Sequence, residues 1–386
     1  MIDTKEDIIR QRLACQQISG AVFTRPEDLV SWMGCIQAQD FAGAKWAIGS
    51  RLKGGDAAPV PTDAVIEQLF NEGKILRTHV LRPTWHFVAP EDIRWMLALT
   101  APRIKAGSAG YRRQLGMEKG VFSKSQRILK ESLKGGRQLS RKELALAFQG
   151  AGIRTDEERM VHLLMEAELE GLICSGGLEG KQFTYALMED RVPAGKIFNK
   201  EEALGELALR YFRSRGPATL GDFAWWSGLT VADARIGVEG NRSKYGSIVV
   251  DGKTYWYYAG EGGGGAKIDG STEIDGGAGI NGAEINGGGI NGGEDGGLYV
   301  LPAYDEYTVA YTDRDLVIHP KHAQRSANGI FKPILVKDGR ITGIWQRTIK
   351  KDSIVVGTDL FRPVGKRQVQ TAFAGYSAFM GKKIVW

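Results

Sequence analysis

Residues 140–187 read SRKELALAFQGAGIRTDEERMVHLLMEAELEGLICSGGLEGKQFTYAL, and this stretch decides the fold. Ser140 followed by Glu143 predicts a capping box, because the hydroxyl accepts from the third amide of a helix while the carboxylate accepts from the cap amide. A second helix is predicted to start at Thr155 and to end near residue 170. Two strand-like runs, Leu172–Cys174 and Gln182–Leu187, flank glycine-rich residues and predict a β-hairpin. Helix, turn, helix and hairpin in this order indicate a winged helix.

The same order of signals occurs on both sides of this stretch. Upstream, Thr24-Arg25-Pro26-Glu27 predicts a capped helix, and strand character from Ile75 to Val88 follows a second predicted helix. Downstream, Thr219 and Thr230 each precede an aspartate by three positions and predict two further helix starts. The sequence therefore predicts three tandem winged-helix units, over residues 1–120, 121–195 and 196–245.

Beyond residue 245 the pattern changes to short strands. Five runs are rich in β-branched and aromatic residues: Ile248–Val250, Thr254–Tyr258, Thr308–Tyr311, Ile334–Val336 and Ile341–Trp345. The Asp338-Gly339 pair between the last two runs favours a primed hairpin turn. We therefore expect a small C-terminal β-barrel over residues 246–386, and an α+β fold that is C-shaped overall.

One segment, Gly260–Gly297, stands apart in composition. It holds 17 of the 52 glycines and five Ile-Asp-Gly or Ile-Asn-Gly triplets, spaced five or six residues apart. A calcium-binding β-roll also repeats Gly and Asp at a short period. The spacing drifts, however, and the segment has too few apolar residues to close a core. We interpret it as a flexible surface insertion.

Charge, cysteines and hydropathy restrict the function. The net charge is +6 and the pI is about 9.0. Because the glycine-rich segment carries −6, the remaining chain carries +12, which favours a polyanionic partner, nucleic acid first. No apolar run reaches the ~18 residues of a membrane span, and the acidic first residues do not resemble a secretory signal. Three widely spaced cysteines exclude a disulfide framework and a CxxC zinc site, and they fit a cytoplasmic location.

The second helices of the winged-helix units do not look like DNA readers. Base readout needs Arg, Lys, Asn or Gln on that helix. The middle one carries six acids against Arg159, and the third offers Arg235. We therefore expect these units to form a scaffold.

Two uncharged amides, Gln37 and Gln39, lie between the two helices of the first unit. At i and i+2 in a turn or extended segment they point the same way, and each offers an acceptor and two donors. Their spacing is also compatible with ordinary hydrogen bonding within a turn.

Four segments together resemble one known family. They are Gln37-Ala38-Gln39, Arg77–Val88, Asp222–Leu229 and Leu301–Tyr307. The chain resembles the winged-helix DNA-binding domain-containing family that includes the AlkZ-type DNA glycosylases, which confer resistance to bulky alkylating and crosslinking antibiotics. The resemblance covers the chain except for Gly260–Gly297. It implies three winged helices and a β-barrel around double-stranded DNA, with Gln37 and Gln39 as catalytic residues.

The implied chemistry is hydrolysis of the N-glycosidic bond of N7-alkylated purines. Alkylation at N7 places a positive charge on the base and weakens this bond, so two neutral amides suffice to orient water. Bulky or crosslinked adducts are an open extension of this substrate class. The reaction needs no metal and no cofactor, and no obligate protein partner is inferred. The alternative is a non-enzymatic winged-helix DNA-binding or transcription-regulatory protein.

Several other residues have a structural and a functional interpretation. On one strand, Arg82, Thr84 and His86 share a face, which indicates either a packed sheet or a DNA contact from His86. We expect structural roles for Asp305 and Glu306, on opposite faces of a strand, and core packing for Trp225 and Trp226. Asp40, next to Gln39, is expected to point elsewhere.

The C-terminal basic residues form either a solvated loop or a DNA contact. The family resemblance favours contact with phosphates, and the candidates are Arg325, Lys332 and Arg347, with Lys350 and Lys351 extending the surface.

Overall fold

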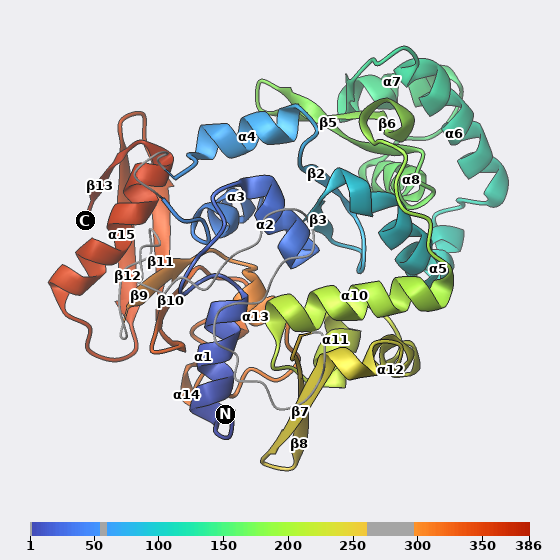
Figure 1. Ribbon diagram of the computed structural model, residues 1–386. Coiled ribbons are helices and arrows are strands. Elements are labelled where there is room, and N and C mark those ends of the chain that lie inside the picture. The colour runs from blue at the N-terminus through green and yellow to red at the C-terminus, as the bar shows by residue number, and fades with distance from the viewer. Residues whose placement is uncertain (1, 55–59, 261–296) are drawn as a thin grey trace.

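The computed structural model describes residues 2–54, 60–260 and 297–386. The glycine-rich insertion therefore lies outside the described residues, apart from Gly260 and Gly297. Figure 1 shows a five-stranded sheet on one side of the molecule and a larger, mainly helical part on the other. The mixed α+β class predicted from the sequence is confirmed.

One order of elements occurs three times in the described residues: a helix, a short strand or bridge, two helices and a hairpin. The first set comprises α2 (Pro26–Met33), β1 (Cys35–Gln37), α3 (Phe41–Gly49), α4 (Asp63–Asn71), β2 (Leu76–His79) and β3 (Trp85–Val88). The second comprises α6 (Lys119–Leu133), β4 (Leu139–Ser140), α7 (Arg141–Gly150), α8 (Glu157–Leu169), β5 (Ile173–Glu179) and β6 (Gln182–Leu187). The third comprises α10 (Lys200–Arg215), an Ala218–Trp256 bridge, α11 (Leu220–Ser227), α12 (Val231–Glu239), β7 (Tyr245–Val250) and β8 (Lys253–Tyr258).

Three further helices lead into or connect these sets: α1 (Lys5–Cys15), α5 (Pro90–Gln114) and α9 (Met188–Arg191). In the first two sets the strand order is the same, with the third strand in the middle, as β1-β3-β2 and β4-β6-β5. The hairpin therefore pairs with the short strand that precedes the two helices.

Helix starts follow the predicted caps with two exceptions. Ser140 with Glu143 and Thr219 with Asp222 form capping boxes. The Thr24 prediction is wrong: Pro26 occupies the first helical position, so the cap position falls on Arg25, which makes no side-chain cap bond. Helix α8 is capped by Asp156 instead of Thr155. Asp156 lies three positions before Arg159, and its Oδ1 accepts from the Arg159 amide at 3.1 Å.

The C-terminal sheet is curled into a half-barrel and has the order β13-β12-β11-β10-β9. Its strands are β9 (Leu298–Leu301), β10 (Ile334–Lys337), β11 (Arg340–Ile349), β12 (Ser353–Leu360) and β13 (Lys383–Val385). The remaining elements are α13 (Glu306–Val309), α14 (Pro320–Ala323), α15 (Lys366–Met380) and short 3₁₀ turns at Arg242–Lys244 and Ala327–Gly329. Asp338 and Gly339 both have positive φ, as the predicted primed turn requires.

One strand prediction for this region is wrong. Thr308 and Val309 end helix α13, and Ala310 and Tyr311 follow it, because Asp305 caps that helix by accepting from the Tyr307 amide at 2.8 Å. The strands predicted at Ile248–Val250 and Thr254–Tyr258 are confirmed as β7 and β8. They form a separate two-stranded sheet, and β8 bridges to Ala218 beside α10. Among the described residues this hairpin is not hydrogen-bonded to the five-stranded sheet.

An aromatic core joins the first helical set to the half-barrel. Trp46 of α3 is fully buried and donates through Nε1 to the Val300 carbonyl of β9 at 2.7 Å. Its ring packs against Tyr376 and Phe379 of α15. Because burying a large aromatic side chain stabilises a fold by roughly 2–3 kcal/mol, these contacts hold α3 and the preceding strand β1 against the half-barrel. None of the helices in the described part of the chain is long and apolar enough to cross a membrane.

Candidate active site

The two glutamines lie where strand β1 ends and helix α3 begins. Gln37 is the last residue of β1, is 8% exposed, and pairs in register with His86 of β3. Gln39 lies two residues beyond the strand and is exposed. Asp40 starts helix α3 by accepting from the Gly43 amide at 3.0 Å. Asp40 is therefore a helix cap that separates Gln39 from the helix.

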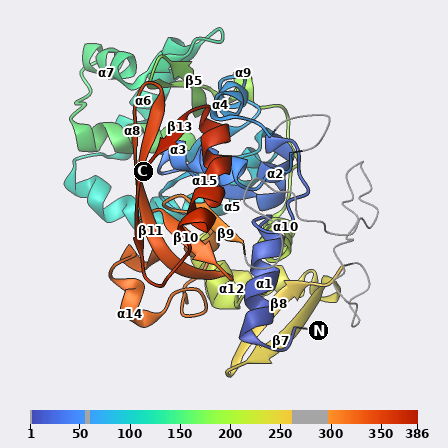
Figure 2. The same cartoon turned by 90° about the vertical axis from the view of Figure 1, so that its left-hand side faces the viewer.

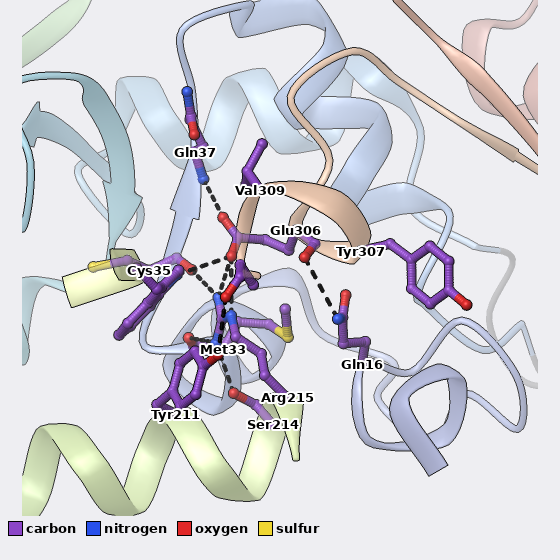
Figure 3. Close-up of polar contacts among 12 residues, drawn as sticks. Gln16, Met33, Cys35, Gln37, Tyr211, Ser214, Arg215, Glu306, Tyr307 and Val309 are labelled. Atoms are coloured by element: carbon purple, nitrogen blue, oxygen red, sulfur yellow. Dashed lines mark hydrogen bonds and ion pairs between the residues drawn. The ribbon is translucent and has the colours of Figure 1, made fainter. Parts of the chain in front are cut away.

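A buried ion pair holds the backbone of Gln37. The Gln37 amide donates to Glu306 Oε1 at 2.8 Å, while Arg215 donates to Glu306 Oε2 through Nε at 2.9 Å and Nη2 at 2.7 Å (Figure 3). Trp226 Nε1 donates to the same oxygen at 3.0 Å. Arg215 also donates to the Cys35 carbonyl at 2.6 Å. Helices α10, α11 and α13 therefore fix the end of β1.

The carboxylate next to Glu306 is also paired. Asp305 accepts from Arg51 Nη2 at 2.6 Å and from Arg51 Nη1 at 2.9 Å, and both residues are buried. Such a two-bond arrangement is the strongest that a guanidinium and a carboxylate form. The expected structural roles of Asp305 and Glu306 fit this geometry. They do not lie on a strand, however, since Asp305 caps helix α13 and Glu306 begins it.

The side chain of Gln37 extends away from Glu306 (Figure 3) and meets Arg82. Arg82 Nη2 donates to Gln37 Oε1 at 3.3 Å. Because a guanidinium only donates, the atom that faces Arg82 is the carbonyl oxygen of the amide. Burial lowers the pKa of Arg82 and the charge of Glu306 opposes this shift, but an arginine in a protein remains a cation at neutral pH.

His86 lies beneath this site. Its ring is fully buried, its Nδ1 lies 2.9 Å from the Thr84 carbonyl, and its Nε2 has no hydrogen-bond partner among the described residues. Burial, followed by the charge of Arg82, lowers the pKa of His86 well below its ordinary value. A neutral, fully buried ring does not reach DNA on the surface, so the packed-sheet interpretation replaces the predicted DNA contact. Strand β3 starts at Trp85, so Arg82 and Thr84 lie in the preceding loop.

The two neighbouring tryptophans of α11, Trp225 and Trp226, differ in solvent exposure. Trp226 is fully buried, as expected, but Trp225 is 46% exposed and the prediction of core packing is wrong for it. Adjacent helical residues point about 100° apart, so one ring enters the core while the next reaches the surface. Trp225 is held by a hydrogen bond from Nε1 to the Val309 carbonyl at 3.1 Å, and the Arg82 guanidinium lies 5.6 Å from its ring centroid.

The predicted phosphate contacts lie on the half-barrel side. Arg325 pairs with Asp359 at 2.6 Å, and Lys332 Nζ donates to the Arg325 carbonyl at 2.9 Å. Arg347 of β11 lies 3.8 Å from Asp40 Oδ2. The structure therefore brings the β11–β12 hairpin next to the glutamine motif, whereas Arg325 and Lys332 form a separate exposed group.

Sequence reasoning missed three contributors to this site: Arg82, Arg215 and Glu306. Arg82 lies within the quoted Arg77–Val88 segment, so its proximity to the glutamines in the first unit could have been suspected. Arg215 and Glu306 reach Gln37 only through the tertiary fold. No group of three or more His, Cys, Asp or Glu side chains that could hold a metal occurs among the described residues.

Comparison with known proteins identifies the family. The family model described as DNA glycosylase AlkZ-like matches residues 30–375. Since this match spans most of the sequence, the chain belongs to the AlkZ-like DNA glycosylase family, which confirms the resemblance inferred from the motifs. The chain is similar to the interstrand DNA cross-link repair glycosylase of Streptomyces sahachiroi, with 23% identity over 338 residues that cover 83% of this chain and 81% of the relative.

The solved structure of Streptomyces sahachiroi DNA glycosylase AlkZ has the same fold. It matches with a TM-score of 0.75 at 20% identity, over 100% of both chains.

Proposed function

We propose that this chain is a monofunctional DNA glycosylase that hydrolyses the N-glycosidic bond of N7-alkylated purines in double-stranded DNA. Gln37 and Gln39 position the attacking water near C1′ of the sugar. The relative from Streptomyces sahachiroi is named an interstrand DNA cross-link repair glycosylase, which supports extending the substrates to bulky and crosslinked adducts.

The observation that carries this proposal is that three carboxylates at the motif are already engaged. Asp40 caps helix α3, Asp305 pairs with Arg51, and Glu306 pairs with Arg215. Asp305 and Glu306 are also buried, so neither can deprotonate water or stabilise a sugar cation, and Asp40 lies between the Gly43 amide and Arg347. A site built from neutral amides suits a substrate whose leaving base already carries a positive charge, because the chemistry then needs positioned water more than a strong base.

The threefold order of helix, strand, helix, helix and hairpin supports three winged-helix units. Helix α8, the second helix of the middle unit, is buried from Leu163 to Leu169, and its two acids in this part, Glu166 and Glu168, have partners inside the protein. Glu168 contacts His79, and Glu166 pairs with Arg112. The second half of this helix cannot enter a major groove because it is buried, and its exposed first turn carries Glu157 and Glu158, which would repel phosphates. Burial and acidic charge together therefore argue against sequence reading and against the regulatory alternative.

The half-barrel contributes the rest of the DNA-binding surface. Ile349, at the end of β11, is exposed, and Lys350 and Lys351 follow in the turn to β12. Arg347 places this hairpin beside Asp40 and hence beside the motif. We infer that the hairpin contacts the duplex and that Arg347, Arg325 and Lys332 bind phosphates.

A cytoplasmic location belongs to the same proposal. The three cysteines are unpaired in the structure. Burial raises the pKa of the Cys15 thiol to about 11, so this thiol stays protonated and poorly reactive at neutral pH.

The test is incubation of the purified protein with duplex DNA that contains N7-methylguanine or a bulkier N7 adduct, followed by quantification of abasic sites. We expect release above the spontaneous rate, and a Gln37→Ala/Gln39→Ala double variant serves as the matched control. Release at the spontaneous rate from all adducts tested would overturn the proposal. Selection from a random duplex pool distinguishes the glycosylase from a transcription regulator, because a regulator enriches a sequence motif and a glycosylase does not.

A further inference from the structure

Two arginines next to the glutamine motif lack an ion-pair partner among the described residues: Arg77, whose Nε donates to the Ala38 carbonyl, and Arg82. No carboxylate lies within ion-pair distance of the Arg82 guanidinium among the described residues, and no described residue accepts from its Nε or Nη1. Nε is buried. By contrast, three fully buried arginines nearby each face a carboxylate: Arg12, Arg51 and Arg215. Arg82 is thus a partly buried cation whose charge the described part of the protein does not neutralise.

The loop that carries Arg82 is held in a defined conformation. The Arg82 amide donates to the Val80 carbonyl at 2.7 Å, and the Leu81 amide donates to Thr100 Oγ1 at 3.2 Å. Leu81 has a φ of 63°, a left-handed conformation that is costly for a branched side chain. A Cβ on Gly228, in the α11–α12 turn, would clash with the Leu81 carbonyl oxygen, so this turn packs directly against the loop. Arg82 is therefore presented by a backbone that packing fixes.

Arg82 lies between the Gln37 side chain and the half-exposed ring of Trp225. One nitrogen donates to Gln37 Oε1, and the guanidinium lies by the ring of the half-exposed Trp225. A guanidinium has five N–H donors in a rigid fork. Because Nε is buried and one N–H of Nη2 bonds Gln37, the donors left for a ligand are those of Nη1 and the second N–H of Nη2. The residue can therefore hold the amide and accept an anionic ligand at the same time.

We propose that Arg82 binds a phosphodiester oxygen of the damaged strand and so fixes the Gln37 amide relative to that strand. This inference rests on the proposed glycosylase function and names a positioning residue for it. A phosphate fits better than a base edge, because the usual arginine acceptor, purine N7, is alkylated and the lesion is itself cationic. Arginine forms two-bond contacts with phosphate, which neutralise its charge and orient it.

The test combines two measurements on Arg82→Ala, Arg82→Lys and the control Arg10→Ala. Arg10 lies on α1, is 73% exposed, and its replacement removes the same charge away from the site. The first measurement is the salt dependence of binding to undamaged and abasic duplex. Arg82→Ala should lower the slope of log K against log salt by roughly one unit, whereas Arg82→Lys and Arg10→Ala should preserve it.

The second measurement is single-turnover release of N7-methylguanine at saturating protein. Both Arg82 variants should slow release, by up to about 10²-fold, because an ammonium keeps the charge but cannot hold Gln37 and a phosphate in one rigid geometry. Far-ultraviolet circular dichroism and the melting temperature establish that each variant is folded.

Each outcome decides the proposal separately from the proposed function. A wild-type salt slope in folded Arg82→Ala would overturn the phosphate contact, whatever happens to the rate. A lowered slope with an unchanged release rate would overturn the positioning role. If the wild-type protein releases no base, the glycosylase proposal fails, and the salt slopes still decide whether Arg82 binds phosphate.

Discussion

Two arginine–carboxylate pairs of similar length lie in very different surroundings. Arg215 and Glu306 are 2.7 Å apart and their side chains are 0% and 1% exposed, whereas Arg325 and Asp359 are 2.6 Å apart and 48% and 51% exposed. Exposed pairs typically contribute about 0–1 kcal/mol, while removal of one partner from a buried pair costs about 3–5 kcal/mol. The comparison indicates that the buried pair supports the glutamine strand and that only a small free energy opposes separation of the exposed pair.

The largest expected effect comes from breaking the buried pair. Glu306→Ala leaves Arg215 buried without its carboxylate and removes the acceptor of the Gln37 amide, which should cost about 3–5 kcal/mol. For a chain of this size the melting temperature should fall by about 6–20 °C. Calorimetry on Glu306→Ala and on the matched Asp359→Ala measures the difference, and equal melting temperatures for the two variants would contradict it.

The next largest effect is expected on the rate of base release, without a change in DNA affinity. The Gln37→Ala and Gln39→Ala variants should each slow single-turnover base release by about 10²-fold or less, because the lesion supplies its own leaving-group activation. Their DNA affinity and salt slope should stay unchanged, since a neutral amide neutralises no phosphate. If the folded double variant releases N7-alkylguanine at the wild-type rate, the two glutamines are ordinary structural residues.

Gln39→Asp tests the same site by adding a carboxylate instead of removing an amide. Gln39 is exposed, so a carboxylate can be placed there without burying a charge. A negative charge near the sugar should stabilise an oxocarbenium-like transition state, so activity should survive and extend toward less labile lesions. Loss of activity with N7-methylguanine would argue against a sugar cation near residue 39.

A smaller effect concerns pH. The folded-state pKa of His86 lies well below that of the unfolded chain, so the unfolded state binds more protons below about pH 6.5 and stability falls as the pH falls. Between pH 7 and pH 5.5 this residue should therefore lower the stability of the wild type progressively. Denaturation curves at several pH values should show a shallower loss for His86→Gln than for the wild type. Identical slopes would show that His86 titrates normally.

The smallest effect is expected at the exposed pair. Arg325→Ala should weaken DNA binding and lower the salt slope by at most about one unit, since Asp359 already partly neutralises this arginine. The saturated rate of base release and the melting temperature should stay close to wild type. A change in salt slope larger than that of Arg82→Ala would show that Arg325 contributes more to phosphate binding than Arg82, contrary to this expectation.

Features that depend on nearby residues could be predicted from the sequence. The capping boxes at Ser140 and Thr219 and the primed turn at Asp338-Gly339 were predicted correctly, because each is decided within four residues. The error at Thr24 is also local, since Pro26 sets the first helical position. Gln37 and Gln39 were recognisable by their chemistry and family motif, although their roles remain predictions.

The sequence by itself thus determined the order of helix, helix and hairpin in the first two sets, the positive charge of the foldable part and the family. Only the tertiary structure decided that Glu306, 269 positions away, holds the Gln37 amide, that Trp225 is half-exposed beside the buried Trp226, and that Arg82 lacks a carboxylate. The physical reason is that burial and charge neutralisation depend on which distant segments pack together. Adjacent residues share a local pattern, but their solvent exposure and electrostatic partners come from the rest of the fold.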